Sequence, residues 1–418
     1  MRKKGWLGIA VLAAGLLPLA AQQVREERTV VNVGVPVRVF QGGAFVPDLG
    51  LKDFEVLEDG VPQKLEAVYL VHGTAVERRE EASRFSPSTQ RHFYLFFEIT
   101  DFTPQMSKAL EYFIESVLAP GDTVSVITPV RTYRMRLKAL EMQSKPAVAA
   151  QLEGILRQDT LGGSAEYRRL IEELEDIARA LTRAIVDLQS EDVSALPQPG
   201  ANALQTSLFR TADFRPEQLL VQYGAALSNM EAIRKLDVAR MLRFASQLRN
   251  EDGQKYVFLF YQREFLPEVE PRILQTFIAL SQDRPDSQHT AASIFEFYRR
   301  YNAFDLESVK RAYADASIAI HFLFVSEPVR HAIGLKFRER SEDVYPAFRE
   351  MAVSTGGTFE ASANPEALLK DAVASAENYY LLYYSPSNPL RDGSFRKITV
   401  RVRGKDYRIT NRQGYIAD

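Results

Sequence analysis

Three runs of apolar residues constrain the fold most, because each is long enough for a strand but shorter than a membrane span. The runs are His92–Ile99, Tyr256–Tyr261 and Ile318–Val325. Apolar residues follow one another here with almost no alternation, which is typical of strands that are buried on both faces. Such strands belong to parallel sheets with helices packed on both sides. We therefore expect an α/β layer structure.

Segments with apolar residues at every third or fourth position predict helices around these strands. They cover residues 104–118, 145–157, 271–282, 290–315, 344–355 and 364–377. Two further strands are expected at Thr123–Thr128 and 131–139. The alternation of strands and helices predicts a doubly wound, mostly parallel sheet within residues 92–377.

The segment 160–225 is longer than a normal connection, so we expect it to contain an inserted helical hairpin. Its first half has the apolar stripe of one long amphipathic helix. The stripe consists of Tyr167, Leu170, Leu174, Ile177, Leu181, Ile185 and Leu188. It packs either on its own domain or on a partner, and the spacing alone leaves both possibilities open.

Both ends of the chain have the pattern of β-strands. Valine occupies every second position from Val31 to Val39, and Pro36 between them favours an edge strand. Further strands are expected at 53–57, 63–71, 379–384 and 395–402. Neither set is large enough to form a core alone. We therefore expect residues 29–71 and 378–417 to form one β-sandwich-like domain, with 72–91 as a charged linker and the α/β domain of residues 92–377 inserted between them.

The N-terminus has the pattern of a secretory signal peptide. Arg2, Lys3 and Lys4 precede an apolar run, and small residues end at Ala21. Residues 1–21 are therefore expected to be removed after Ala21, which predicts a periplasmic or secreted protein without a transmembrane segment in its mature form. The alternative is an uncleaved N-terminal anchor.

Composition and motifs exclude several classes of function. The 52 basic and 54 acidic residues give a formal net charge of −2, whereas a nucleic-acid surface normally brings a basic excess. Arg240, Arg243 and Arg249 lie near Phe244, but export and the acidic balance argue against nucleic acid as the partner. The chain has no cysteine, and neither a zinc spacing, a nucleophile elbow nor a phosphate loop is present. We expect no enzyme.

Two terminal motifs resemble those of the von Willebrand factor type A-related proteins common in Acidobacteria. The first is Leu51–Gln63, LKDFEVLEDGVPQ, and the second is Tyr379–Pro386, YYLLYYSP, followed by Asp392–Ile398 and Gly414-Tyr415. Leu118–Val124 and Gly356-Gly357 match less specific stretches of the family. The resemblance spans most of residues 29–417. It implies a type A domain, with a central, mostly parallel sheet that has helices on both faces.

The resemblance also implies a place for a metal-ion-dependent adhesion site, which has Asp-x-Ser-x-Ser after the first strand and an Asp after the fourth. Here Glu98, Thr100 and Phe102 occupy the first three positions, and Gln262 occupies the last. Mg²⁺ requires about six well-placed oxygens, and the side chain of Phe102 has no oxygen to offer. We expect no metal or other cofactor. If one binds, it would be Mg²⁺ or Mn²⁺ at Glu98, Thr100, Asp101 and Thr103.

These observations predict an exported, non-enzymatic protein–protein interaction module with a degenerate, metal-free binding rim. The rim is expected at the carboxyl ends of the strands, at residues 98–105, 262–268 and 326–335. Its candidate contact residues are Glu98, Thr100, Asp101, Thr103, Gln262 and Glu264. One alternative is a structural component of an envelope assembly that acts through the helical insertion. Another is an envelope hydrolase, in which Glu98 or Glu264 would be required for turnover.

Overall fold

The structure is a computed structural model, and it confirms a mixed α/β fold with several sheets. It describes residues 32–82, 85–135, 143–194, 216–234, 237–283, 285–299, 305–327, 331–332, 335–341, 344–404 and 406–418. The predicted signal segment 1–21 lies outside the described residues.

The central sheet has the strand order β14-β12-β10-β7-β8-β9. Its members are β7 (Arg91–Glu98), β8 (Thr123–Ile127), β9 (Thr132–Met135), β10 (Gln254–Gln262), β12 (Ile318–Val325) and β14 (Phe359–Ser362). Neighbouring strands pair in parallel except β9, which is antiparallel to β8 at the edge. The three apolar runs in the sequence are β7, β10 and β12, because these strands fill the middle of the sheet.

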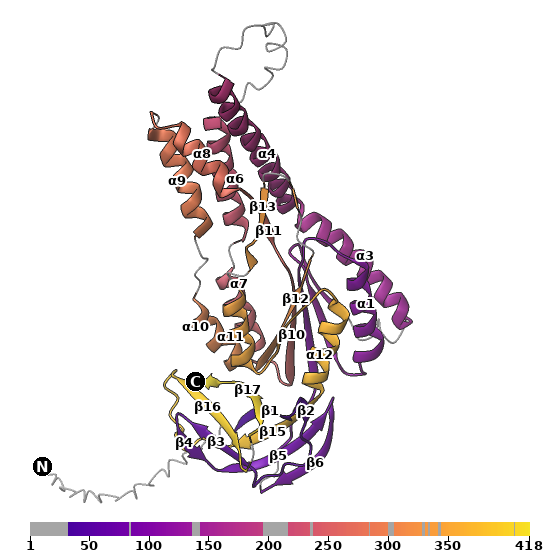
Figure 1. The fold of residues 1–418 in the computed structure, drawn as a ribbon. Helices are drawn as coiled ribbons and strands as arrows, with labels where there is room; N and C mark the ends of the chain where they lie inside the picture. Colours follow the sequence, from indigo (N-terminus) through magenta and orange to yellow (C-terminus); the bar gives the residue numbers. More distant parts are fainter. Residues whose placement is uncertain are drawn as a thin grey trace, which may run out of the picture. The chain divides into compact units, whose positions relative to one another are not determined.

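Helices pack on both faces of this sheet (Figure 1). One face presents Phe93, Leu95 and Phe97 to α1 (Pro104–Tyr112), η1 (Phe113–Val117, a π-helical turn), α3 (Lys145–Gly163) and α12 (Pro365–Glu377). The other face presents Tyr94 and Phe96 to α7 (Val238–Leu248), α10 (Leu306–Asp315) and α11 (Tyr345–Thr355). Successive residues of β7 therefore serve two different cores, which explains why its sequence is apolar throughout.

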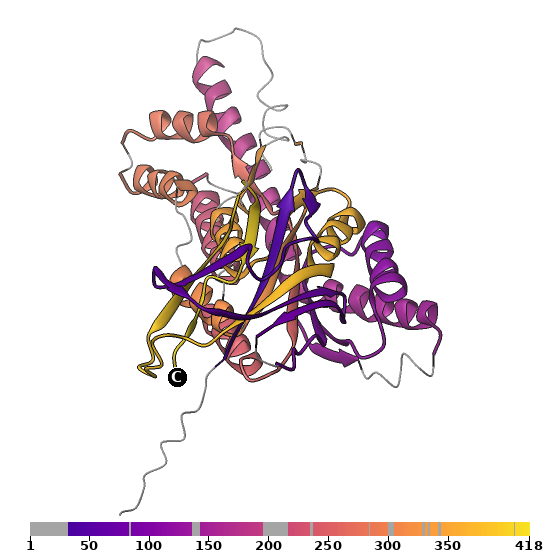
Figure 2. The same cartoon turned by 90° about the horizontal axis from the view of Figure 1, so that it is seen from below.

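Two antiparallel sheets contain the remaining strands of both chain ends. One has the order β17-β1-β15-β5-β6, with β2 beside β1, and the other has the order β18-β16-β3-β4. The strands are β1 (Val33–Gln41), β2 (Ala44–Phe45), β3 (Phe54–Glu58), β4 (Val61–Gln63), β5 (Leu65–His72), β6 (Ala75–Glu81), β15 (Asn378–Tyr384), β16 (Phe395–Val402), β17 (Arg408–Asn411) and β18 (Gly414–Ile416). N-terminal and C-terminal strands lie side by side (Figure 2), and side chains from both sheets share one core.

Two expectations for this region were wrong. Strand β1 is not an edge strand, because β15 and β17 flank it. Pro36 is tolerated because β17 pairs only with Val37–Phe40, so no second neighbour requires its missing N–H. The expected linker 72–91 contains β6, which pairs with β5 at the sheet edge. The unbroken run of charged residues at 77–81 obscured the strand, although charge is common on edge strands.

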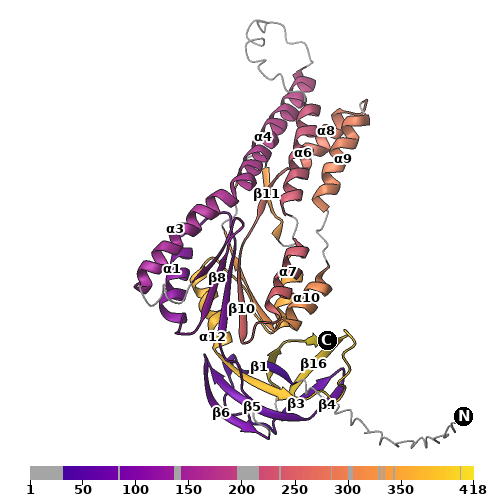
Figure 3. The same ribbon diagram turned by 180° about the vertical axis from the view of Figure 1, so that it is seen from behind.

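A separate hydrophobic core lies among the remaining helices, α4 (Ala165–Ser194), α6 (Pro216–Arg234), α8 (Pro271–Leu280) and α9 (Pro285–Arg299). The antiparallel pair β11 (Phe265–Val269) and β13 (Leu335–Glu339) contributes to the same core. Figure 3 shows these helices grouped with β11 in the upper part of the view, above the central sheet. The expected hairpin at 160–225 therefore corresponds to α4 and α6, and α6 extends to Arg234. Residues 195–215 lie outside the described part.

Candidate functional site

The loop after β7 carries most of the predicted rim residues. Strand β7 ends at Glu98, Ile99 is buried, and α1 begins at Pro104. The hydroxyl of Thr103 caps this helix, accepting a hydrogen bond from the Met106 N–H at 3.4 Å. Thr103 is thus part of the helix N-cap, a role that polar side chains commonly have at this position.

Gln262, the last residue of β10, holds this loop from the neighbouring strand. Its Oε1 accepts hydrogen bonds from the backbone N–H groups of Thr100 (2.7 Å) and Asp101 (2.9 Å). Its Nε2 donates to the carboxylate of Glu327. The Gln262 side chain is 3% exposed. The amide therefore fixes the loop at the carboxyl ends of β7 and β10, where the strand order of the sheet reverses.

The junction of α3 and α4 holds the same loop from the other side. The Thr100 carbonyl accepts hydrogen bonds from the Ser164 hydroxyl at 2.9 Å and from Arg168 Nη1 at 3.3 Å. Arg168 also lies 4.0 Å from the Asp101 carboxylate, which is largely exposed. Two segments that are distant in sequence, the end of β10 and the α3–α4 junction, thus position the Thr100-Asp101 peptide.

These residues do not fit the implied metal site. Glu98 belongs to the face of β7 that carries Tyr94 and Phe96, Thr103 caps a helix, and Asp101 lies beside Arg168. The ring of Phe102 lies 5.0 Å beneath the guanidinium of Arg157 instead of offering an oxygen. No group of three or more His, Cys, Asp or Glu side chains in the described part of the chain is arranged to hold a metal ion. Mg²⁺ tolerates such incomplete oxygen sets badly.

Glu264 lies two residues beyond Gln262 and has different contacts. Its Oε1 accepts a hydrogen bond from the Tyr261 hydroxyl at 3.1 Å, and its backbone N–H donates to Ser341 Oγ at 3.3 Å. Of the expected rim segment 326–335, residues 328–330 and 333–334 lie outside the described residues. Within the rest of that segment, Glu327 contacts Gln262.

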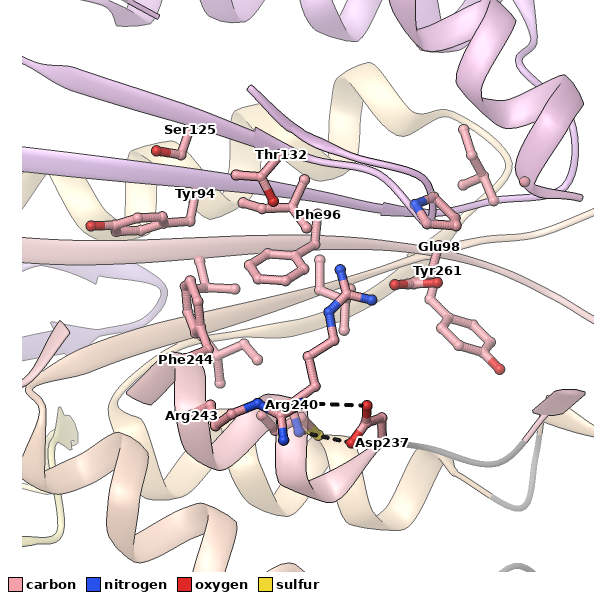
Figure 4. Close-up of a pocket in the computed structure, with 18 of the residues that line it drawn as sticks. Tyr94, Phe96, Glu98, Ser125, Thr132, Asp237, Arg240, Arg243, Phe244 and Tyr261 are labelled. Atoms are coloured by element: carbon pink, nitrogen blue, oxygen red, sulfur yellow. Dashed lines mark hydrogen bonds and ion pairs between the residues drawn. The ribbon is translucent and has the colours of Figure 1, made fainter. Parts of the chain in front are cut away.

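A cavity of about 840 Å³ adjoins the rim on the face of the sheet that α7 covers (Figure 4). Its floor comes from β7, β8 and β9, and α7 forms one wall. The rim residues Glu98, Thr100 and Glu264 line it, whereas Asp101, Thr103 and Gln262 do not. The cavity is also lined by aromatic and charged side chains, among them Tyr94, Phe96, Arg134, Glu166, Asp237, Arg240, Arg243, Phe244 and Glu251.

Aromatic contacts define the cavity wall. Phe244 of α7 packs edge-on against Tyr94 and Phe96 of β7, with ring centroids 5.3 and 5.1 Å apart. Asp237 caps α7 by accepting a hydrogen bond from the Arg240 N–H at 2.8 Å. This cap fixes where the helix begins. Arg240 therefore lies about one turn after the cap, and Phe244 lies about one turn after Arg240.

The electrostatics of the cavity centre on Glu98. Burial raises the pKa of Glu98, with an opposing effect from Arg240 and a further rise from the nearby carboxylate of Glu264. Burial and a hydrogen bond to Glu251 also raise the pKa of the Tyr94 hydroxyl. Both groups are therefore held toward their neutral forms.

Arg240, Arg243 and Phe244 stand out in the sequence, but their pattern alone predicts no binding role for them. The structure places all three around the cavity, whereas Arg249 forms ion pairs with Asp315 and Asp418. The spacing of Arg240 and Phe244, one helical turn apart, was the available signal. The cavity itself depends on where α7 packs, which no local pattern reveals.

Comparisons with known proteins found no matching family model, curated protein or solved structure. Within the residues that the structure describes, no helix combines the length and apolarity that crossing a bilayer requires.

Proposed function

We propose that this chain is an exported, non-enzymatic binding protein related to the von Willebrand factor type A class. In this proposal its rim contacts a protein partner without a metal ion. Export rests on the signal pattern of residues 1–21. The type A assignment rests on the terminal motifs and is supported by the parallel strand order of the central sheet with helices on both faces.

The observation that carries the proposal is the pair of hydrogen bonds from Thr100 and Asp101 to Gln262. In a metal-dependent site, an ion would organise this loop and attract a partner's carboxylate. Here a neutral side-chain amide organises the loop. Such an arrangement leaves the Asp101 side chain, 60% exposed, available at the surface. A rim built in this way needs no ion to adopt its binding conformation.

Site-specific photo-crosslinking in exporting cells tests this proposal. A photoreactive residue at Asp101 lies on the rim, and one at Leu390, which is 65% exposed in a loop before β16, serves as the control. We expect a discrete protein adduct from position 101 that persists in EDTA, and none from position 390. Absence of an adduct at position 101 would contradict partner binding, and loss in EDTA would contradict metal independence.

A structural role in an envelope assembly is the second candidate, and exposed apolar side chains on the helical part favour it. Val186 of α4 is 44% exposed and Val221 of α6 is 61% exposed. We would compare the sedimentation of the wild type with that of Val186→Ser, Val221→Ser. Val353→Ser is the control, since Val353 on α11 is 60% exposed, close to Val221. Self-association lost only in the α4–α6 variant would support this role.

A further inference from the structure

The cavity beside the rim is suited to a small molecule rather than to a single inserted side chain. Its volume of about 840 Å³ lies within the range of roughly 300–1,000 Å³ that is usual for ligand pockets. One protein side chain would leave most of that space empty. Phe96 and Phe244 supply an aromatic surface on the floor and the wall. An apolar body is therefore the first requirement on a ligand.

Most acidic groups around the cavity already have partners. Asp237 caps α7 and lies 3.8 Å from Arg243. The Glu251 carboxylate accepts a hydrogen bond from the Tyr94 hydroxyl at 2.8 Å, and Glu166 forms an ion pair with Arg169 at 2.8 Å. Arginines thus offset the charges of Asp237 and Glu166, and the Tyr94 hydroxyl occupies one acceptor position of Glu251. These three carboxylates therefore contribute less to the field inside the cavity than their number suggests.

Glu264 and Glu98 lie at the rim end. The Tyr261 hydroxyl donates to Glu264 at 3.1 Å. Burial favours the neutral form of Glu98, in which its carboxyl group is able to donate a hydrogen bond. A bound anion beside a neutral carboxyl group is not repelled as it would be by a carboxylate.

Two lining arginines remain, Arg134 of β9 and Arg240 of α7. Arg240 is the one on the helix that also carries Phe244. Its backbone N–H is used by the helix cap, but its guanidinium makes no hydrogen bond or ion pair with any described residue. Figure 4 shows the side chain extending from α7 toward Phe96 and Glu98. A guanidinium offers five donors in a planar fork that matches a carboxylate. The cation and the aromatic surface thus face the same space.

We propose that this cavity binds a small amphipathic organic acid, whose aromatic or aliphatic body packs on Phe96 and Phe244 and whose anionic group pairs with Arg240. This activity goes beyond the partner binding proposed for the rim, with which the cavity shares Glu98, Thr100 and Glu264. It requires neither a metal nor a protein ligand.

Two fluorescent probes with related bodies test the proposal on the full chain. 1-Anilinonaphthalene-8-sulfonate carries an aromatic body and one negative charge, and N-phenyl-1-naphthylamine has the same body without the charge. We expect Arg240→Gln to weaken binding of the sulfonate by roughly tenfold or more, as for loss of a charged hydrogen bond, and to leave the neutral probe unchanged. Arg401→Gln, an exposed arginine on β16, is the control.

Two further measurements sharpen the result. Glu98→Gln should bind the sulfonate at least as tightly as the wild type, because it fixes the neutral form. Decanoate should displace the sulfonate from the wild type and require roughly tenfold higher concentration on Arg240→Gln. The proposal is overturned if the two arginine variants bind the sulfonate equally, or if neither probe binds the wild type. Unchanged circular dichroism spectra of the variants establish that they are folded.

Discussion

The side-chain oxygen of Gln262 accepts a hydrogen bond from the backbone N–H of Thr100 at 2.7 Å. This hydrogen bond joins the end of β10 to the loop that follows β7. It stands at the reversal of strand order, where open α/β sheets usually bind their ligands. In the family that the sequence resembles, this position carries a metal-binding aspartate. An amide that donates and accepts at the same time gives the loop a fixed shape through the chain's own atoms.

Replacing Gln262 with alanine should therefore loosen the rim. Two backbone N–H groups lose the Gln262 acceptor, and Glu327 loses the hydrogen bond from Gln262. We expect a loss of about 1–3 kcal/mol in unfolding free energy, measured by urea denaturation. Gln151→Ala, an exposed glutamine on α3, should change stability little. Equal stability of the two variants would mean that the Gln262 contacts do not organise the loop.

The pH dependence of stability should reveal Glu98. Because its folded-state pKa is raised above 4.5, its protonated form stabilises the fold fully at low pH, and that contribution is lost as pH rises through the folded pKa. Glu98→Gln keeps a neutral side chain, so it should be more stable than the wild type at pH 7.5. The difference should shrink toward pH 4.5. A constant difference across this range would contradict the burial of the carboxyl group.

His321 should act in the opposite direction. It is fully buried in β12, where Nδ1 lies 2.9 Å from Thr358 Oγ1, and burial lowers its pKa to about 3. The unfolded chain therefore binds a proton below about pH 6.5 that the folded chain does not, and stability falls with acidification. His321→Phe retains a ring to stack on Phe258. Its urea midpoint should be less sensitive to acid between pH 6.5 and 4.5. Equal slopes for the two proteins would rule out a buried neutral histidine.

Gly357 tests the packing of the loop between α11 and β14. A Cβ atom at Gly357 would lie 1.8 Å from the backbone oxygen of Ile320 in β12. Gly357→Ala should therefore cost about 3 kcal/mol or more, because the backbone has to move. Gly154→Ala is the matched control, since its Cβ would meet no atom in the exposed part of α3. It should stabilise by about 0.5–1 kcal/mol. Thermal unfolding of both variants gives the comparison.

The sequence predicts the sheet well, because burial on both faces makes β7, β10 and β12 almost continuously apolar. It misses β6, because the charged side chains of that edge strand look like a linker. The proximity of Thr100 and Gln262 follows from parallel strands ending at one edge. Their hydrogen bond does not follow, since side-chain direction at a strand end depends on tertiary packing. The cavity also remains hidden, because residues of α7 reach β7 only in three dimensions.

Metal titration tests the central claim most directly. Mg²⁺, Mn²⁺ and Ca²⁺ would be titrated into the purified chain by calorimetry, with the thermal midpoint measured in parallel. Our account predicts no saturable heat and no rise in the midpoint, because Gln262 already organises the loop and the donor set is incomplete. Saturable binding that disappears in Glu98→Ala, Asp101→Ala would contradict it, and would make the rim a metal-dependent adhesion site.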